Sequence, residues 1–180
     1  MSQASLSIYN RQSARPLNLR QFRTIARRLL QTELLLTAYD LTVHFVAAPE
    51  MTLLNETHLH HHGSTDVITF DYSEVPCQRV VSSGLELENS PKLEASGLEF
   101  SQIHAEIFIC IDEALLQAHR FRTTWQSEIV RYFIHGALHL LGHDDLRPTP
   151  RRRMKREESR LLRALSKHFN FRKIAKRPPD

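Results

Sequence analysis

The sequence is poor in cysteine and has no long apolar run. Its 180 residues include two cysteines, Cys77 and Cys110, which are too few for a disulfide framework or a thiolate cage around a metal ion. No apolar segment approaches the roughly 20 residues that cross a bilayer. The first residues also lack the charged and then apolar layout of a signal peptide. These absences argue against a disulfide-rich secreted domain and a membrane-spanning protein, and they favour a cytoplasmic location.

The composition and patterning favour one compact domain. Hydrophobic residues make up 41% of the chain, which is enough for one core, and no internal repeat is present. Residues 73–101 are dominated by Ser, Gly, Pro and Glu, which predicts a loop or an inserted hairpin. We expect a single domain over 1–168 and a basic C-terminal tail over 169–180, frayed from position 172 onward.

Hydrophobic periodicity predicts alternating strands and helices. Strand-like composition marks residues 5–12, 41–48, 64–72 and 102–112. Helical spacing marks residues 19–35, 49–59, 112–120, 123–142 and 152–168. Asn18 is a good N-cap for the first helix, and Pro49 suits the first turn of the second. This order favours a layered domain of strands and helices.

The charge is unevenly distributed. Residues 147–180 hold 13 Lys/Arg against 3 Asp/Glu, a local net charge of +10, whereas the remaining 146 residues carry 11 against 17. A cationic segment on an acidic body suggests a polyanionic partner, usually nucleic acid. The alternative is a solvated helix face followed by a tail.

The stretch "YFIHGALHLLGHDD" (132–145) predicts a metal site. His135 and His139 are four residues apart, so both imidazoles leave one face of a helix and can reach the same ion. Gly142 supplies the helix stop, after which the chain can turn back and add a third ligand. Two helical imidazoles and one later ligand leave a coordination position for water, as in catalytic zinc sites. The candidates for the third ligand are His143, Asp144 and Asp145.

Two alternatives weigh against this interpretation. Two histidines at this spacing also occur by chance, and a buried helical histidine is more often hydrogen-bonded than metal-bound. The metalloprotease version of the motif has Glu directly after the first His as general base, but position 136 is Gly. Peptide hydrolysis is therefore disfavoured.

These residues resemble the bacterial YbeY family of endoribonucleases, the rRNA maturation factors. "HGALHLLGHDD" matches the family signature HGxLHLxGYDH except at His143 and Asp145. "LNETHLHHHGSTDVITF", "AEIFICIDEA" and "MKREESRLL" resemble three further family segments in order and spacing. The resemblance covers about residues 40–165. It implies an α+β fold, with a small, mostly parallel mixed sheet, surrounding helices and a zinc site on the HxxxH helix.

The resemblance also implies a function and a ligand set. The expected activity is zinc-dependent cleavage of single-stranded RNA in rRNA maturation and ribosome quality control, with RNA and the small ribosomal subunit as partners. One Zn²⁺ per chain would be held by His135, His139 and Asp145. Asp145 stands where the family has its third histidine, and His143 is the alternative third ligand. The basic stretch 147–177 and the arginines between Arg20 and Arg28 would hold the RNA backbone.

One departure from the family bears on catalysis. Leu59 stands where the family has the Arg that holds the scissile phosphate, and leucine cannot contact phosphate as the planar guanidinium does. The adjacent histidines at 60–62 can offer donors or form a solvated loop. The catalytic side chains are thus unassigned. The second reading is a ribosome-associated assembly or RNA-binding factor with a structural metal and weak or no nuclease activity.

Two acidic positions carry alternatives of their own. Asp66 lies before the third strand, where it is either part of the site wall or an ordinary turn residue. Glu106 lies among apolar residues, where it either orients a metal-bound imidazole or faces solvent.

Overall fold

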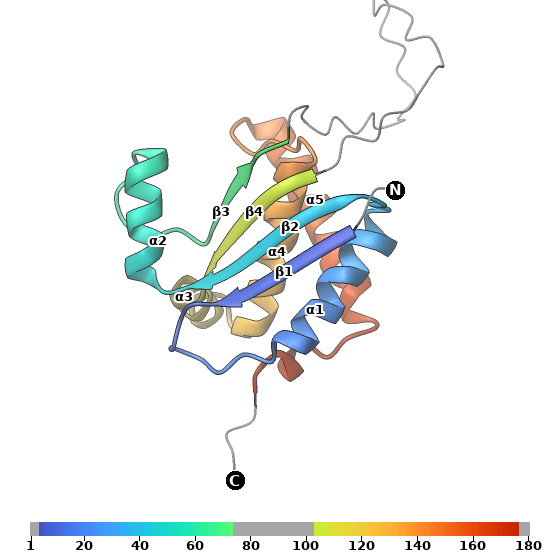
Figure 1. Ribbon diagram of the computed structural model, residues 1–180, viewed down its shortest axis with the longest axis horizontal. Helices are drawn as coiled ribbons and strands as arrows, with labels where there is room; N and C mark the ends of the chain where they lie inside the picture. The colour runs from blue at the N-terminus through green and yellow to red at the C-terminus, as the bar shows by residue number, and fades with distance from the viewer. Residues whose placement is uncertain (1–3, 74–102, 177–180) are drawn as a thin grey trace, which may run out of the picture.

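The computed structural model describes residues 4–73 and 103–176. The predicted loop or hairpin over 73–101 falls almost entirely outside the described residues. A four-stranded sheet in the order β1-β2-β4-β3 forms the centre of the described fold (Figure 1). β1, β2 and β4 run parallel and β3 is antiparallel to β4. The α+β fold with a small, mostly parallel mixed sheet is therefore confirmed.

The strands are β1 Ala4–Asn10, β2 Tyr39–Val46, β3 Val67–Asp71 and β4 Ile103–Cys110. The α-helices are α1 Leu19–Arg27, α2 Ala48–Leu54, α3 Ile111–Phe121, α4 Trp125–Leu140 and α5 Pro148–Ser166. Two π-helical segments, η1 Arg28–Glu33 and η2 Asn55–Leu59, continue α1 and α2, and η3 Phe171–Ile174 is a 3-10 helix. None of the described helices is both long and apolar enough to span a membrane.

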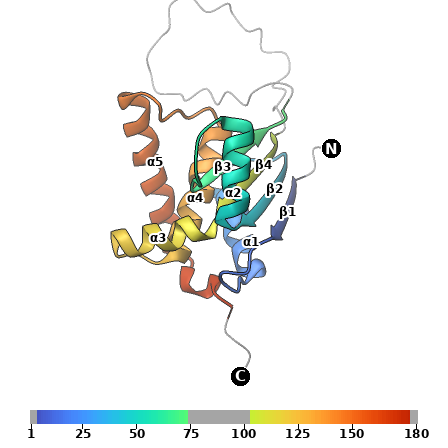
Figure 2. The ribbon, with the colours of Figure 1, turned by 90° about the vertical axis from the view of Figure 1, so that its left-hand side faces the viewer.

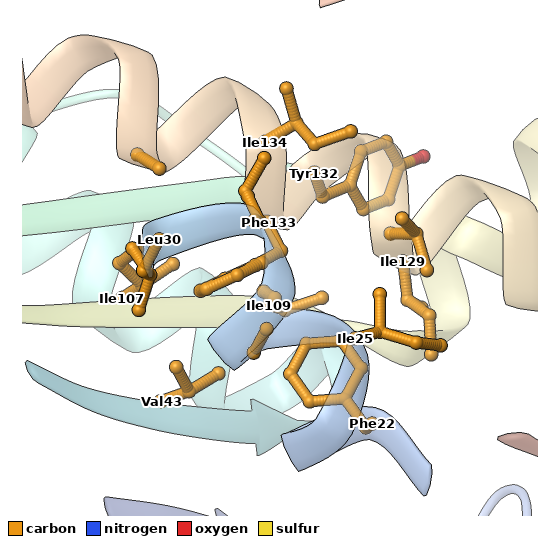
Figure 3. Close-up of a cluster of buried hydrophobic side chains, with 14 of the residues drawn as sticks. Phe22, Ile25, Leu30, Val43, Ile107, Ile109, Ile129, Tyr132, Phe133 and Ile134 are labelled. Carbon is orange, nitrogen blue, oxygen red and sulfur yellow. The ribbon is translucent and has the colours of Figure 1, made fainter. Parts of the chain in front are cut away.

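The main core lies between one face of the sheet and the helices α1 and α4. Phe22 of α1 makes edge-on ring contacts with Phe45 of β2 and Phe133 of α4, at centroid distances of 4.8 and 5.4 Å. Figure 3 shows Phe22 and Phe133 near the branched residues of β2 and β4, including Val43, Ile107 and Ile109. Because α4 is apolar on most of its surface, it can pack against the sheet and α5 at once (Figure 2).

A second, smaller core lies around α2. Met51 of α2 packs with Val46, Ile68, Phe108 and Cys110, which come from β2, β3 and β4. These strand residues alternate with those of the main core, as expected when the two faces of a sheet are covered by different helices. The sheet is thereby held on both sides near the carboxyl ends of β2 and β4.

The predicted elements are present, with shifted boundaries. Asn18 caps α1 by accepting a hydrogen bond from the Gln21 backbone N–H at 3.1 Å, and Pro49 lies in the first turn of α2. The helices expected over 19–35 and 49–59 both change from α- to π-helical geometry partway along. Apolar spacing alone does not distinguish these two geometries.

The predicted frayed tail is wrong for positions 172–176. Ile174 and Phe171 pack into the main core, and the backbone of Ala175 pairs with that of Leu17. Asn18 N–H also donates to the Ile174 carbonyl at 2.8 Å. Phe171 and Ile174 are three positions apart and pack this segment, through η3, against the start of α1. The many basic residues around them obscured this apolar pair in the sequence.

Candidate functional site

His135 and His139 lie on successive turns of α4 and face each other. Their Nε2 atoms are 3.1 Å apart, and their rings meet nearly edge to face at a centroid distance of 4.6 Å. The predicted pairing of the two imidazoles on one helix face is therefore present. Both side chains are partly exposed, at 24% and 31%, so an ion can reach them from solvent.

A glycine turn ends α4 and returns the chain to these histidines. Gly142 has a positive φ of 81°, its N–H donates to the His139 carbonyl at 2.9 Å, and the His143 N–H donates to the Leu138 carbonyl at 3.0 Å. This pair of bonds defines a Schellman motif, whose left-handed position favours glycine. The turn places Asp145 beside the imidazoles.

Asp145 completes a group of three convergent ligand atoms. Its Oδ2 lies 3.8 Å from Nε2 of His135, and its Oδ1 lies 3.9 Å from Nε2 of His139. One ligand atom from each of the three residues lies within 4.8 Å of the others, and no second group of this kind occurs in 4–73 or 103–176. Two imidazole nitrogens and a carboxylate oxygen suit zinc and leave a coordination position for water.

The other nitrogen of each imidazole has a partner that orients the ring. Nδ1 of His139 lies 3.0 Å from the His143 carbonyl oxygen. Nδ1 of His135 lies 3.2 Å from Oε2 of Glu158, which projects from α5. Donation from Nδ1 directs the lone pair of each Nε2 toward the shared point, an arrangement that metal-binding histidines usually have.

Glu158 is a buried carboxylate held by two partners. Its Oε1 accepts a hydrogen bond from Arg131 at 2.7 Å, and its side chain is only 10% exposed. Burial raises the pKa of Glu158, but the hydrogen bonds from His135 and Arg131 and the charge of Arg131 lower it overall. Glu158 is therefore anionic at neutral pH and can orient His135.

The two imidazoles differ in how readily they bind a proton. Burial lowers the pKa of His135, but the hydrogen bond and charge of Glu158, together with Asp66 and Asp145, outweigh burial and raise it. Burial and the nearby His135 lower the pKa of His139, and Asp145 offsets only part of this. Of the two imidazoles, His135 therefore binds a proton more readily than His139.

Gly136 lies where α4 approaches the sheet most closely. A Cβ at this position would lie 3.1 Å from Cγ2 of Thr69, 3.2 Å from Cγ2 of Ile107 and 3.3 Å from Cγ2 of Val67. No longer side chain fits there, so the glutamate of the metalloprotease motif could not follow His135 in this fold. The close packing of α4 against the sheet therefore explains why position 136 is Gly. The same Gly argues against peptide hydrolysis, because it stands where a metalloprotease has its general base.

A cavity of about 630 Å³ opens beside His135 and Asp145. Side chains of α3, α4 and α5 line it, and Asp66 lies in its wall. Oδ1 of Asp66 accepts hydrogen bonds from the Val67 N–H at 3.0 Å and the Thr65 hydroxyl at 3.1 Å. Asp66 is therefore a turn residue that also lines this cavity. We call this space the α4–α5 cavity.

Two other sequence candidates lie away from the triad. Glu106 is hydrogen-bonded to Nε2 of His44 at 3.2 Å and to the Tyr72 hydroxyl, so its imidazole partner is not a residue of the triad. Leu59 ends η2, is 45% exposed and does not line the α4–α5 cavity as described. Neither residue reaches the place where His135, His139 and Asp145 converge.

The two predicted basic segments meet at one side of the fold. Arg28, which begins η1, lies 3.3 Å from Nε2 of His168, just beyond α5. The cationic side chains of α5 are mostly exposed, as are Arg20 and Arg27 of α1. The structure thus brings the start of η1 next to the residues just beyond α5, which are far apart in sequence.

Sequence reasoning did not single out Glu158, Arg131 or Phe121. A signal for Glu158 existed, because it lies in the apolar stripe of α5 between Met154 and Leu161, where a carboxylate needs a partner. Arg131 lies one turn before His135 and shares its face of α4. Phe121, which lines the cavity, had no distinguishing signal.

The comparisons with known proteins agree with the geometry. The family described as endoribonuclease YbeY matches residues 7–166. The relatives named endoribonuclease YbeY include one from Staphylococcus aureus, 30% identical over 69% of this chain and 72% of its own length. Those from Chlorobium phaeovibrioides and Salinibacter ruber are 35% and 32% identical over 64% and 62% of this chain. The matched region covers 61% of the length of each of these two relatives.

A solved structure shows the same fold. The solution structure of TM1509 from Thermotoga maritima superposes with a TM-score of 0.55 over 89% of this chain and 88% of that one, at 18% identity. At this identity the likeness concerns the fold alone. Because the family match extends over 7–166 and includes α4, its turn and α5, the chain belongs to the YbeY family.

Proposed function

We propose that this protein is a zinc-dependent endoribonuclease that hydrolyses single-stranded RNA in the cytoplasm, in rRNA maturation and ribosome quality control. The observation that carries the proposal is the convergence of ligand atoms from His135, His139 and Asp145 within 4.8 Å. The name endoribonuclease, borne by its relatives, supports RNA as the substrate.

The chain's own residues prepare the site for hydrolysis. One zinc ion bound by the triad would supply Lewis acidity and lower the pKa of a water beside the phosphodiester. Glu158 and the His143 carbonyl hold the two imidazoles in the orientation that such a site needs. Their contacts cross from α4 to α5 and around the Gly142 turn, so the ligand geometry depends on packing between these elements.

Asp66 is the side chain best placed to accept a proton. The other carboxylates of the cavity wall have basic partners: Glu128 and Glu158 pair with Arg131, and Asp145 faces the two imidazoles. Asp66 forms no ion pair within 4–73 and 103–176, and its charge is close enough to raise the pKa of His135. It would therefore act as general base toward the attacking water.

The basic surface would hold the RNA backbone. Single-stranded RNA presents one phosphate per nucleotide, and exposed Lys and Arg bind phosphates without reading sequence. The basic residues of 147–177, together with Arg20 to Arg28, would provide such a surface.

Metal content and cleavage test the proposal together. Wild-type protein purified without added metal should carry one divalent ion per chain and cleave a single-stranded rRNA-precursor fragment. The variant with His135→Ala and His139→Ala should lose both, whereas His119→Ala, an exposed histidine of α3, should retain both. Equal metal content in all three proteins would contradict the proposal.

Leu59 favours a second candidate. Because the family's phosphate-binding Arg is replaced, the protein would act as a ribosome-associated assembly or RNA-binding factor whose metal is structural. Zinc-loaded protein that binds RNA but cleaves none of it across the pH range would favour this candidate over the nuclease.

A further inference from the structure

The loss of the family Arg at Leu59 raises the question of what holds the substrate phosphate in this chain. Leu59 does not line the α4–α5 cavity as described. The cavity is instead lined by two basic residues of α5, Arg151 and Lys155, which are four residues apart and so leave the same face of the helix. Ser159, one turn further on, lines it as well.

Arg151 and Lys155 are the cations of this cavity that have no carboxylate partner among the described residues. Arg131 is occupied by Glu158 at 2.7 Å and by Glu128 at 3.4 Å. Arg151 and Lys155 are exposed and form no ion pair with any residue that the structure describes. An anion that entered the cavity would therefore find two cations free to bind it, with His135 and Asp145 in the same wall.

An exposed aromatic ring lies at the same cavity. Phe121 ends α3, is 61% exposed and lines the cavity, and the Arg120 guanidinium lies 5.4 Å from the ring centroid. A large ring left in solvent gains by stacking on a nucleobase, and proteins hold unpaired RNA bases in this way. The volume of about 630 Å³ falls within the usual range for small-ligand sites.

We infer that the α4–α5 cavity is a nucleotide subsite for single-stranded RNA, in which Arg151 and Lys155 contact the phosphate and Phe121 stacks on the base. This inference rests on the proposed function and deepens it. The phosphate would then be held by residues of α5 and not by the η2 position of Leu59, whose side chain cannot bind phosphate. Arg151 and Lys155 are positioning residues that hold the phosphodiester next to His135 and Asp145.

The smaller hollow on the other face of the sheet does not fit such a ligand. Asp40 and Glu106 line this hollow of about 370 Å³, and no Lys or Arg lines it in the described part of the chain. Phosphate would be repelled there. Of these two hollows, as the described residues form them, the α4–α5 cavity is the one that is lined by Lys and Arg, by an exposed ring and by two residues of the triad, His135 and Asp145.

A charge-matched pair of variants tests the phosphate contacts. Arg151→Ala with Lys155→Ala removes two positive charges from the cavity wall, whereas Arg152→Ala with Arg156→Ala removes two from the same turns of α5 outside it. Binding of a fluorescein-labelled single-stranded RNA octamer to the full chain is measured by anisotropy, in chelator to prevent cleavage and again with zinc. The cavity pair should weaken binding about tenfold or more and reduce the salt slope by about 1.4, at roughly 0.7 per lost contact. The control pair should weaken it about twofold.

A second comparison tests the stacking contact. Phe121→Ala should weaken octamer binding about tenfold, and Phe121→Trp should restore it, because either aromatic ring can stack on a base. Leu116→Ala is the control, since Leu116 is 63% exposed on the same helix and does not line the cavity. It should leave binding unchanged.

The outcomes separate this inference from the proposed function. Equal losses in the cavity pair and the control pair would overturn the subsite, even if wild-type protein cleaves RNA. If the variants lose binding as predicted but zinc-loaded wild type cleaves no RNA, the subsite would be supported and the proposed nuclease activity would be contradicted. With cleavage present, the cavity pair should raise KM more than it lowers kcat if it positions the phosphate.

Discussion

Oε2 of Glu158 on α5 lies 3.2 Å from Nδ1 of His135 on α4, so the two helices are joined through a buried carboxylate and a metal-ligand candidate. The pair links helix packing to the orientation of the imidazole. It also links the stability of the metal-free protein to pH.

The first prediction concerns Glu158→Gln in metal-free protein. The pKa of Glu158 is lowered from 4.5 and that of His135 is raised from 6.5. The ionic pair therefore stabilises the fold fully between about pH 4.5 and 6.5. The stabilisation declines as pH falls through the lowered pKa of Glu158 and as pH rises through the raised pKa of His135. The difference in unfolding free energy between wild type and Glu158→Gln, from urea titrations, should be largest in that window.

Glu157→Gln is the control for this prediction. Glu157 precedes Glu158 but pairs with Arg160, at 2.6 and 2.9 Å. Its substitution should give a difference without a maximum in this window. A flat difference for Glu158→Gln as well would show that the pair does not ionise as described.

The second prediction is that Glu158→Gln weakens metal binding. Gln can still accept a hydrogen bond from Nδ1 but lacks the negative charge that makes the imidazole a stronger ligand. Loss of such a partner typically costs about 10- to 100-fold in metal affinity. Zinc competition with a chromophoric chelator at pH 7.5 measures it. An affinity equal to that of Glu157→Gln would indicate that Glu158 only packs α5 against α4.

The third prediction concerns Gly136→Ala. Alanine favours a helix by about 1 kcal/mol over glycine, but the new Cβ would lie 3.1 to 3.3 Å from three methyl groups. Overpacking of this kind costs about 1–3 kcal/mol. The variant should therefore be less stable than wild type in urea titrations, despite its better helix propensity.

A double-mutant cycle isolates the cause. Thr69→Ser removes the nearest methyl, Cγ2 at 3.1 Å, and keeps the hydroxyl. In the Thr69→Ser background, Gly136→Ala should cost less than in wild type, which gives a nonzero coupling free energy. Additive effects would place the strain elsewhere.

The fourth prediction assigns the general base. Asp66→Asn keeps an oxygen that can cap the Val67 N–H but cannot accept a proton at neutral pH. Metal content and fold should be retained, whereas kcat should fall by about 10²–10⁴. Asp71→Asn is the matched control. Asp71 is exposed, and its carboxylate also accepts a nearby backbone N–H, that of Ser73 at 2.9 Å. Unchanged kcat in Asp66→Asn would leave Asp66 as a turn residue only.

Much of the fold and part of the site follow from local sequence. The periodicity of α4, the cap at Asn18 and the stop at Gly142 depend on neighbours within a few residues, so they could be predicted. The ligand spacing of His135 and His139 is local for the same reason. The partnership of Glu158 with His135 joins residues 23 positions apart across two helices, and it depends on how α4 and α5 pack. Likewise, Ile174 docks against the start of α1, a long-range contact that the basic character of its segment obscured.

The last prediction decides between Asp145 and His143 as the third ligand. Both carboxylate oxygens of Asp145 face the imidazoles, at 3.8 and 3.9 Å. The His143 carbonyl accepts from Nδ1 of His139 at 3.0 Å, and this backbone contact persists in an alanine variant. Asp145→Ala should therefore lose most of its metal affinity in the chelator competition, whereas His143→Ala should keep it.

Asp145→His extends the test to chemistry. It replaces an anionic ligand with a neutral one, so metal should be retained and the ion should withdraw more electron density from its water. The pH at which RNA cleavage begins should then be lower than in wild type. Loss of metal in His143→Ala rather than in Asp145→Ala would place Asp145 outside the ligand set. The variants could also retain metal as predicted while none of them cleaves RNA at any pH. In that case the replacement of Arg by Leu59 would account for the loss of catalysis, and the RNA-binding factor would be the correct function.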